Sequence, residues 1–159
     1  MNKAETYQYL RDHGVEFEVT EHAAVFNMAE VDTLDLPYRE LDAKNLFVRD
    51  KKKNHYLICV KGDRRVDLKA FRKKHGLSGL SFGSEEDLMT MLGLIPGAVT
   101  PLGLLNDKTR SVGLFLDQSL MGGIIGVHPN DNTATVWMQA SDLVRLLEED
   151  GHTVQVVEI

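Results

Sequence analysis

The chain has 159 residues, 43% of them hydrophobic, and is therefore long enough to bury one sizeable core. Its single cysteine excludes an internal disulfide. No apolar run approaches the ~18–20 residues of a membrane-spanning helix, and the first residues lack the apolar centre of a secretory signal. We therefore expect a cytoplasmic protein.

The net charge of −6 is unevenly distributed. Residues 39–75 contain 13 of the 18 Lys and Arg residues but 5 of the 24 acidic residues. A basic segment in an otherwise acidic chain favours a face that binds a polyanion such as nucleic acid. The alternative is that these lysines only solvate a hairpin tip at 51–53 and a helix end at 73–74.

Hydrophobic periodicity predicts helices and strands in mixed order. In the first half of the chain we expect a helix over 2–13, a strand over 15–20, a short helix over 28–34, and strands over 45–49 and 55–60. A helix over 68–75 capped by Asp67, a short strand over 80–82 and a helix over 85–92 capped by Ser84 should follow. The last part should contain strands over 112–116, 124–127 and 133–138, a helix capped by Ser141 and closed by Gly151, and a strand over 154–156. No repeat or linker divides the chain. The fold class expected is mixed α/β (α+β), a single domain over 1–159 with a central mixed β-sheet flanked by helices.

A proline-flanked loop stands out at Pro96-Gly-Ala-Val-Thr-Pro101. Its two prolines fix φ and lack an amide donor, whereas Gly97 frees the backbone. Apolar residues on both sides are expected to pin the loop to the core. A rigid loop of small residues can offer backbone groups to a small polar ligand, and the alternative is a plain structural turn.

Two polar residues elsewhere are candidate site residues. His128 begins His-Pro-Asn-Asp-Asn-Thr between two expected strands, where functional groups often lie. Asn and Asp there fit a tight turn, but the histidine can also exchange a proton or bind a substrate oxygen. Lys44 precedes an apolar strand and is either a surface charge or, if it points inward, a fixed cation for a phosphate or a developing oxyanion.

The sequence gives little support for a serine or cysteine nucleophile, a metal site or a cofactor site. Gly79-Leu-Ser81-Phe-Gly83 matches the nucleophile-elbow pattern, but Ser81 lies within the apolar run and the chain is short for that fold, so we interpret it as a chance match. Cys59 is expected to be a buried strand residue rather than a nucleophile. The six histidines show no paired spacing, so no metal site is expected, and no dinucleotide fingerprint or phosphate loop indicates a cofactor.

Four motifs in register resemble the YbaK/ProX family of prolyl-tRNA editing domains. They are Ala43-Lys44-Asn45-Leu46-Phe47, Val66-Asp67-Leu68-Lys69, Gly97 to Asp107 with its Val-Thr-Pro-Leu-Gly-Leu run, and His128-Pro129-Asn130 with Asn132-Thr133. The resemblance covers nearly the whole chain. The forms of the lysine and loop motifs are closer to the free-standing ProX branch, which clears alanine from proline tRNA, because the YbaK branch, which clears cysteine, usually carries Thr at the position of Asn45.

This resemblance implies a trans-editing hydrolase that uses neither metal, cofactor nor covalent nucleophile. Its substrate would be the acceptor end of mischarged proline tRNA, and prolyl-tRNA synthetase would be a further partner. Such an enzyme is needed because a synthetase pocket discriminates weakly against a smaller side chain. No membrane or DNA partner is expected, since neither a helix-turn-helix nor an aromatic stacking sheet is evident. Two alternatives stay open: a Cys-tRNA(Pro) deacylase, and a nucleic-acid-binding module without catalysis.

The resemblance also assigns site residues. Lys44 would be the family lysine, Gly97 and Pro101 would bound its Gly-x-x-x-Pro loop, and His128 would be its pocket histidine. These imply catalytic roles for Lys44, Gly97 and His128. The remaining expected substrate contacts are Asn45, Phe26, Met28, Ala98, Val99, Thr100, Pro101, Asn130 and Thr133. The 97–101 backbone would orient a water and the α-amine or carbonyl of the substrate.

Overall fold

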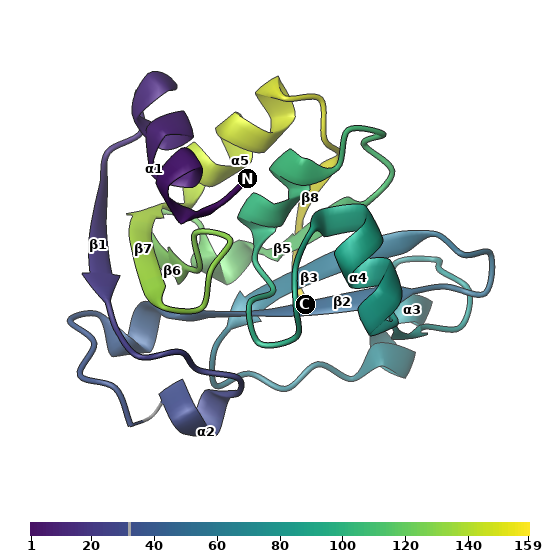
Figure 1. The fold of residues 1–159 in the computed structure, drawn as a ribbon. Coiled ribbons are helices and arrows are strands. Elements are labelled where there is room, and N and C mark those ends of the chain that lie inside the picture. The colour runs from purple at the N-terminus through teal and green to yellow at the C-terminus, as the bar shows by residue number, and fades with distance from the viewer. Residues whose placement is uncertain (32) are drawn as a thin grey trace.

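The computed structural model describes residues 1–31 and 33–159, without the side chain of Met28, and folds them into two β-sheets with helices around them (Figure 1). The larger sheet has five strands in the order β4 (Ser81–Phe82), β2 (Ala43–Arg49), β3 (His55–Lys61), β5 (Gly113–Asp117) and β8 (Val154–Val157). β2 pairs antiparallel with β3 and β4, while β3, β5 and β8 run parallel. The expected mixed central sheet is therefore confirmed.

The structure contains a second sheet that the sequence pattern did not predict. It has three antiparallel strands in the order β1 (Phe17–Glu21), β7 (Ala134–Gln139) and β6 (Ile124–Val127). An isolated bridge between Asp42 and Gly126 connects β6 to the residue just before β2. Alternation alone cannot reveal this division, because it predicts strands but not which strands pair.

The α-helices in the described part of the chain are α1 (Lys3–Asp12), α2 (Met28–Val31), α3 (Leu68–Lys74), α4 (Glu85–Leu92) and α5 (Ala140–Glu149). None of them is long and apolar enough to cross a bilayer. Three 3₁₀ helices that the sequence did not predict are η1 (Arg39–Leu41), η2 (Pro101–Asn106) and η3 (Gln118–Leu120).

Two of the three expected helix caps are formed. The Asp67 side chain accepts hydrogen bonds from the backbone at Lys69 and Ala70, and Ser84 accepts one from Asp87. The expected cap at Ser141 is wrong, because α5 begins at Ala140 with Gln139 at the cap position, two residues earlier than expected, and has no side-chain cap. The Ala140 amide instead donates to the Gly123 carbonyl at 3.0 Å, so β7 leads directly into the helix.

The five-stranded sheet is covered on both faces because successive side chains of a strand point to opposite sides. On one face Leu57, Cys59, Leu114 and Leu116 pack into the main core, to which α1, α4, η2 and α5 also contribute. On the other face Ile58, Val60 and Phe115 pack against Phe71 of α3. Cys59 is fully buried, which confirms its structural interpretation, and burial raises the pKa of its thiol.

Asp42 is a buried carboxyl, only 7% exposed, at the junction of the two sheets, and burial raises its pKa to about 6. The folded state then binds the proton of Asp42 more tightly than the unfolded chain does. The stability that this provides is complete below pH ~4 and is lost as pH rises through about 6.

We expect Asp42→Asn to unfold like the wild type at pH 4 but to be about 2–3 kcal/mol more stable at pH 7.5, a difference that denaturant titrations at the two pH values would measure. Equal stability at both pH values would contradict the assignment.

Candidate active site

A cavity of about 240 Å³, here called the Lys44 cavity, lies where four separate segments meet. They are the residues around the start of α2, the beginning of β2, the proline-flanked loop, and the residue that follows β6. The residues that line it are Val25, Phe26, Asn27, Val31, Ala43, Lys44, Asn45, Gly97, Val99 and His128. The three residues expected to be catalytic therefore share one cavity, together with Phe26, Asn45 and Val99.

Lys44 is fixed by the start of β2, where it pairs with Val60 of β3. Its ammonium donates a hydrogen bond to the Arg64 carbonyl in the segment between β3 and α3. Burial lowers the pKa of Lys44, and the nearby charge of Arg65 lowers it further, while Asp63 opposes both. The result is a positioned cation on the wall of a small cavity, where charge acts more strongly than in water.

His128 follows β6 directly, so the strand fixes its position at the edge of the cavity. Its Nδ1 lies 2.9 Å from the Ala134 carbonyl, which can only accept, so Nδ1 carries the proton. In the neutral ring Nε2 is consequently an acceptor. Burial lowers the pKa of His128, and the charge of His22 acts in the same direction. The two rings meet edge to face with centroids 6.2 Å apart.

The proline-flanked loop is tied to the same histidine. Thr100 is fully buried, and its hydroxyl donates to the His128 carbonyl at 2.6 Å. Thr100 also caps η2, which continues from Pro101. Gly97 has φ +88, and a Cβ placed there would lie 2.9 Å from the Cα of Phe26. The loop is thus held at Gly97 and at Thr100, and its small residues are required by close packing.

Asn45 lines the cavity, but the oxygen of its side chain is not exposed to it. Its Oδ1 is buried and has no hydrogen-bond partner among the described residues. Because a buried acceptor without a donor is costly, a small rotation of this side chain that brought Oδ1 to a donor would be favourable.

The other expected site residues lie elsewhere. Ala98 and Asn130 line a different hollow, and Thr100 and Pro101 are buried in the core. The Asn130 amide donates to the Thr6 hydroxyl, and the Thr133 hydroxyl accepts from Lys3, so both fix the N-terminal helix. The side chain of Met28 lies outside the described structure. Ser81 lies within the exposed strand β4 and not at the turn that follows, unlike a nucleophile elbow.

Sequence reasoning missed Val25, Asn27, Val31 and Ala43, which also line the cavity. Val25 and Asn27 flank Phe26 in the chain, Val31 ends α2, and Ala43 adjoins Lys44. The side chains of Val25, Val31 and Ala43 are apolar and carry no chemical signal, whereas the Asn27 Oδ1 is used locally, where it accepts a hydrogen bond from the Glu30 amide. Within residues 1–31 and 33–159, no group of three or more His, Cys, Asp or Glu side chains is arranged to hold a metal ion.

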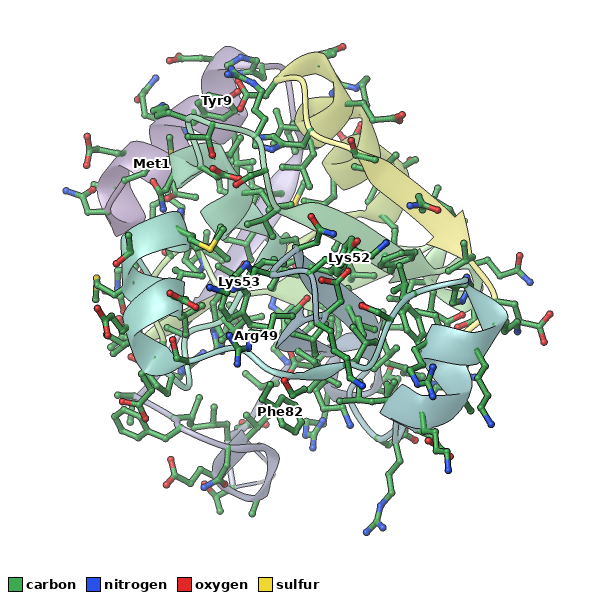
Figure 2. The ribbon with its side chains drawn as sticks, turned by 90° about the vertical axis from the view of Figure 1, so that its right-hand side faces the viewer. Met1, Tyr9, Arg49, Lys52, Lys53 and Phe82 are labelled. Atoms are coloured by element: carbon green, nitrogen blue, oxygen red, sulfur yellow. The ribbon has the colours of Figure 1, made fainter. Side chains whose placement is uncertain are left out.

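The basic segment is not one patch, because besides Arg72, Lys73 and Lys74 in the last turn of α3 it forms two clusters at opposite ends of β2. Arg64 and Arg65 lie next to Lys44, as their contacts show. The β2–β3 hairpin carries Lys51–Lys53 at its opposite end, and Figure 2 shows Arg49, Lys52 and Lys53 on the face toward the viewer. At about 3.3 Å per residue, the seven residues of β2 separate the clusters by roughly 20–25 Å.

The model of the aminoacyl-tRNA editing domain family matches residues 22–146, and the chain belongs to this family. It is 38% identical over 147 residues to the prolyl-tRNA editing protein ProX of Acetoanaerobium sticklandii, covering 91% of this chain and 90% of that protein. It is 35% identical over 154 residues to the prolyl-tRNA synthetase associated domain-containing protein 1 of Danio rerio, covering 95% and 84%. The resemblance on which the sequence analysis relied is thereby confirmed, as is the expectation of an enzyme of the deacylase class.

The solved structures agree with the fold. A crystal structure of a proposed trans-editing enzyme for prolyl tRNA synthetase superposes with a TM-score of 0.70 at 22% identity, covering 100% of this chain and 98% of that one. At this identity the likeness concerns the fold alone.

Proposed function

We propose that this chain, as one editing domain over 1–159, is a cytoplasmic trans-editing deacylase of mischarged proline tRNA, with Ala-tRNA(Pro) as its main substrate. The single observation that carries the proposal is that Lys44, Gly97 and His128 line one small cavity. The relatives support the class of tRNA, since two of them are named for prolyl-tRNA editing and for association with prolyl-tRNA synthetase.

In the reaction, water attacks the carbonyl carbon of the ester, the bond from that carbon to the ribose oxygen breaks, and the ribose oxygen leaves as a hydroxyl with a proton from the water, which frees the amino acid. An aminoacyl ester is already activated, so the enzyme mainly has to place the water and stabilise the developing oxyanion. The backbone near Gly97 is proposed to orient the water and the substrate. Lys44 would neutralise the oxyanion or the terminal phosphate, and the neutral Nε2 of His128 would accept a hydrogen bond from the ribose or from the water.

Selection for alanine is proposed to come from the walls of the cavity. Phe26 and Val99 are proposed to form walls that leave room for a methyl group but exclude the proline ring. Asn45, which lines the same cavity, would contact the substrate beside its α-amine. A wall can exclude a larger side chain by steric overlap, whereas a pocket discriminates weakly against a smaller one.

The deciding experiment is hydrolysis of proline tRNA charged with alanine, cysteine or serine, with correctly charged Pro-tRNA(Pro) as the control. We expect the alanyl ester to be cleaved fastest and the prolyl ester to be spared. Faster cleavage of the cysteinyl ester would favour the Cys-tRNA(Pro) alternative. Binding of tRNA without cleavage of any ester would favour the non-catalytic alternative.

Ionic strength should affect binding strongly, because two basic clusters are proposed to meet tRNA phosphates. We expect KM for Ala-tRNA(Pro) to rise about tenfold or more between 50 and 200 mM salt, with little change in kcat. The alanyl ester of adenosine, which lacks the tRNA body, serves as the control and should show a much weaker salt dependence. A similar dependence for both esters would exclude an electrostatic role of the tRNA body.

The acid side of the pH profile should report His128. Because the pKa of His128 is lowered, the ring stays neutral until the pH falls beneath the ordinary histidine range near ~6.5. Protonation then removes the Nε2 acceptor, so kcat/KM should fall at low pH in the wild type. His128→Gln has no titrating ring, and the ratio of wild-type to variant kcat/KM should decline toward acid pH. A ratio that does not change with pH would assign His128 a structural role.

A further inference from the structure

A second hollow of about 290 Å³, here called the α3 hollow, lies between the segment that precedes α3, the helix itself and Ile159. It is lined by Arg64, Arg65, Val66, Asp67, Ala70, Phe71, Lys74 and Ile159. In Figure 1 the segment from β3 to α3 runs along the lower edge of the molecule, from the side of α2 toward α3. None of the residues expected from the sequence to form the active site belongs to it.

The α3 hollow has an apolar floor and a cationic rim. Val66, Ala70, Phe71 and Ile159 contribute apolar surface, and Phe71 is itself anchored by an edge-to-face contact with Phe115, at 5.0 Å between ring centroids. Arg65 and Lys74 are exposed, and neither forms an ion pair within the described part of the chain. Among the described residues these two unpaired cations outnumber the one carboxylate in the lining, Asp67, which caps α3, so the hollow suits a ligand that combines a flat apolar group with negative charge.

The α3 hollow is connected to the Lys44 cavity through Arg64 and Arg65. The Arg64 carbonyl accepts the hydrogen bond from the Lys44 ammonium, while its guanidinium pairs with the buried carboxylate of Asp117 at 2.6 Å. This pair holds the shared wall in place. The two sites thus adjoin at the contact between Lys44 and Arg64, and Arg64 and Arg65 belong to the lining of the α3 hollow.

We infer that the α3 hollow binds an unpaired nucleotide that precedes the terminal adenosine of tRNA, with Arg65 and Lys74 at its phosphates and the base against Val66, Ala70 and Phe71. The inference rests on the proposed function, because it takes the 3′ end of a tRNA as the molecule in the Lys44 cavity. Contacts to phosphates and to the flat face of a base are the ordinary means by which proteins hold single-stranded nucleic acid. A nucleotide here would orient the ester without any contact to the amino acid.

The test compares the dissociation constants of two ligands, the trinucleotide cytidylyl-cytidylyl-adenosine and adenosine 5′-monophosphate. The wild type should bind the trinucleotide about tenfold more tightly, which corresponds to about 1.4 kcal/mol. Ala70→Leu fills the hollow without changing charge, and leucine is a good helix former at this exposed position. We expect this variant to bind both ligands alike and Lys74→Gln to reduce the difference. Ala4→Leu, a matched change at an exposed position of α1, should retain it.

Equal affinity of the wild type for the two ligands would overturn the inference, and so would a trinucleotide preference that survives Ala70→Leu. Circular dichroism and thermal unfolding establish that the variants are folded. Hydrolysis of Ala-tRNA(Pro) by the wild type is measured separately and tests the proposed function. Because the binding measurement needs no turnover, failure of the nucleotide site and failure of the deacylase assignment give different results.

Discussion

Replacing Lys44 with methionine is expected to lower kcat for hydrolysis of Ala-tRNA(Pro) about 100-fold or more while the protein remains folded. The methionine keeps an apolar stem of similar length along the cavity wall but removes the ammonium. A positioned cation or donor at a developing oxyanion typically contributes a factor of 10²–10³. The substitution also removes the hydrogen bond to the Arg64 carbonyl, which is the contact that orients the Lys44 ammonium. Single-turnover deacylation with saturating enzyme measures the chemical step directly.

The control for this experiment is Lys108→Met, which removes an exposed lysine outside the basic segment and the Lys44 cavity. It should leave kcat unchanged within about twofold, since surface substitutions away from special features have small effects. If Lys44→Met raised KM and left kcat intact, Lys44 would bind the terminal phosphate in ground and transition states alike. If both parameters were unchanged, Lys44 would have no role in the reaction.

Most of the secondary structure follows from the sequence because local rules act strongly in it. Asp67 and Ser84 form caps whose hydrogen bonds lie within one helical turn. The exceptions depend on tertiary contacts. The start of α5 is set by the Ala140 hydrogen bond to Gly123, a residue distant in the chain, and no local pattern contains that information.

The candidate site is predicted only where its residues have chemical character. Lys44 and His128 carry charge or a titrating ring, and Gly97 is marked by its flanking prolines. Asn130 and Thr133 have similar polar character, yet the N-terminal helix uses both. In the turn between β6 and β7, His128 thus lines the cavity, whereas the side chains of Asn130 and Thr133 hydrogen-bond to the N-terminal helix. Only the path of the chain in space distinguishes these roles.

Gly97→Ala is expected to reduce kcat/KM for Ala-tRNA(Pro) about 100-fold at a stability cost of about 1–3 kcal/mol. The stability cost comes from φ +88, a conformation in which a residue with a Cβ is strained. The larger effect on activity has a different origin, because the added Cβ would lie 2.9 Å from the Phe26 Cα and 3.0 Å from its ring. Phe26 belongs to the cavity wall, so relief of that overlap moves the wall into the space proposed for the substrate.

Gly122→Ala separates strain from cavity geometry. Gly122 has φ +85, almost the same as Gly97, but a Cβ there would meet nothing within 4 Å. Both variants share the backbone strain, so Gly97→Ala should lose at least as much stability as Gly122→Ala in denaturant titrations, while Gly122→Ala retains nearly full deacylation. Equal losses of activity in the two variants would assign the effect to strain and make the proline-flanked loop a purely structural turn. A loss confined to Gly97→Ala would mean that the small residue is required by the cavity, since backbone strain is common to both variants.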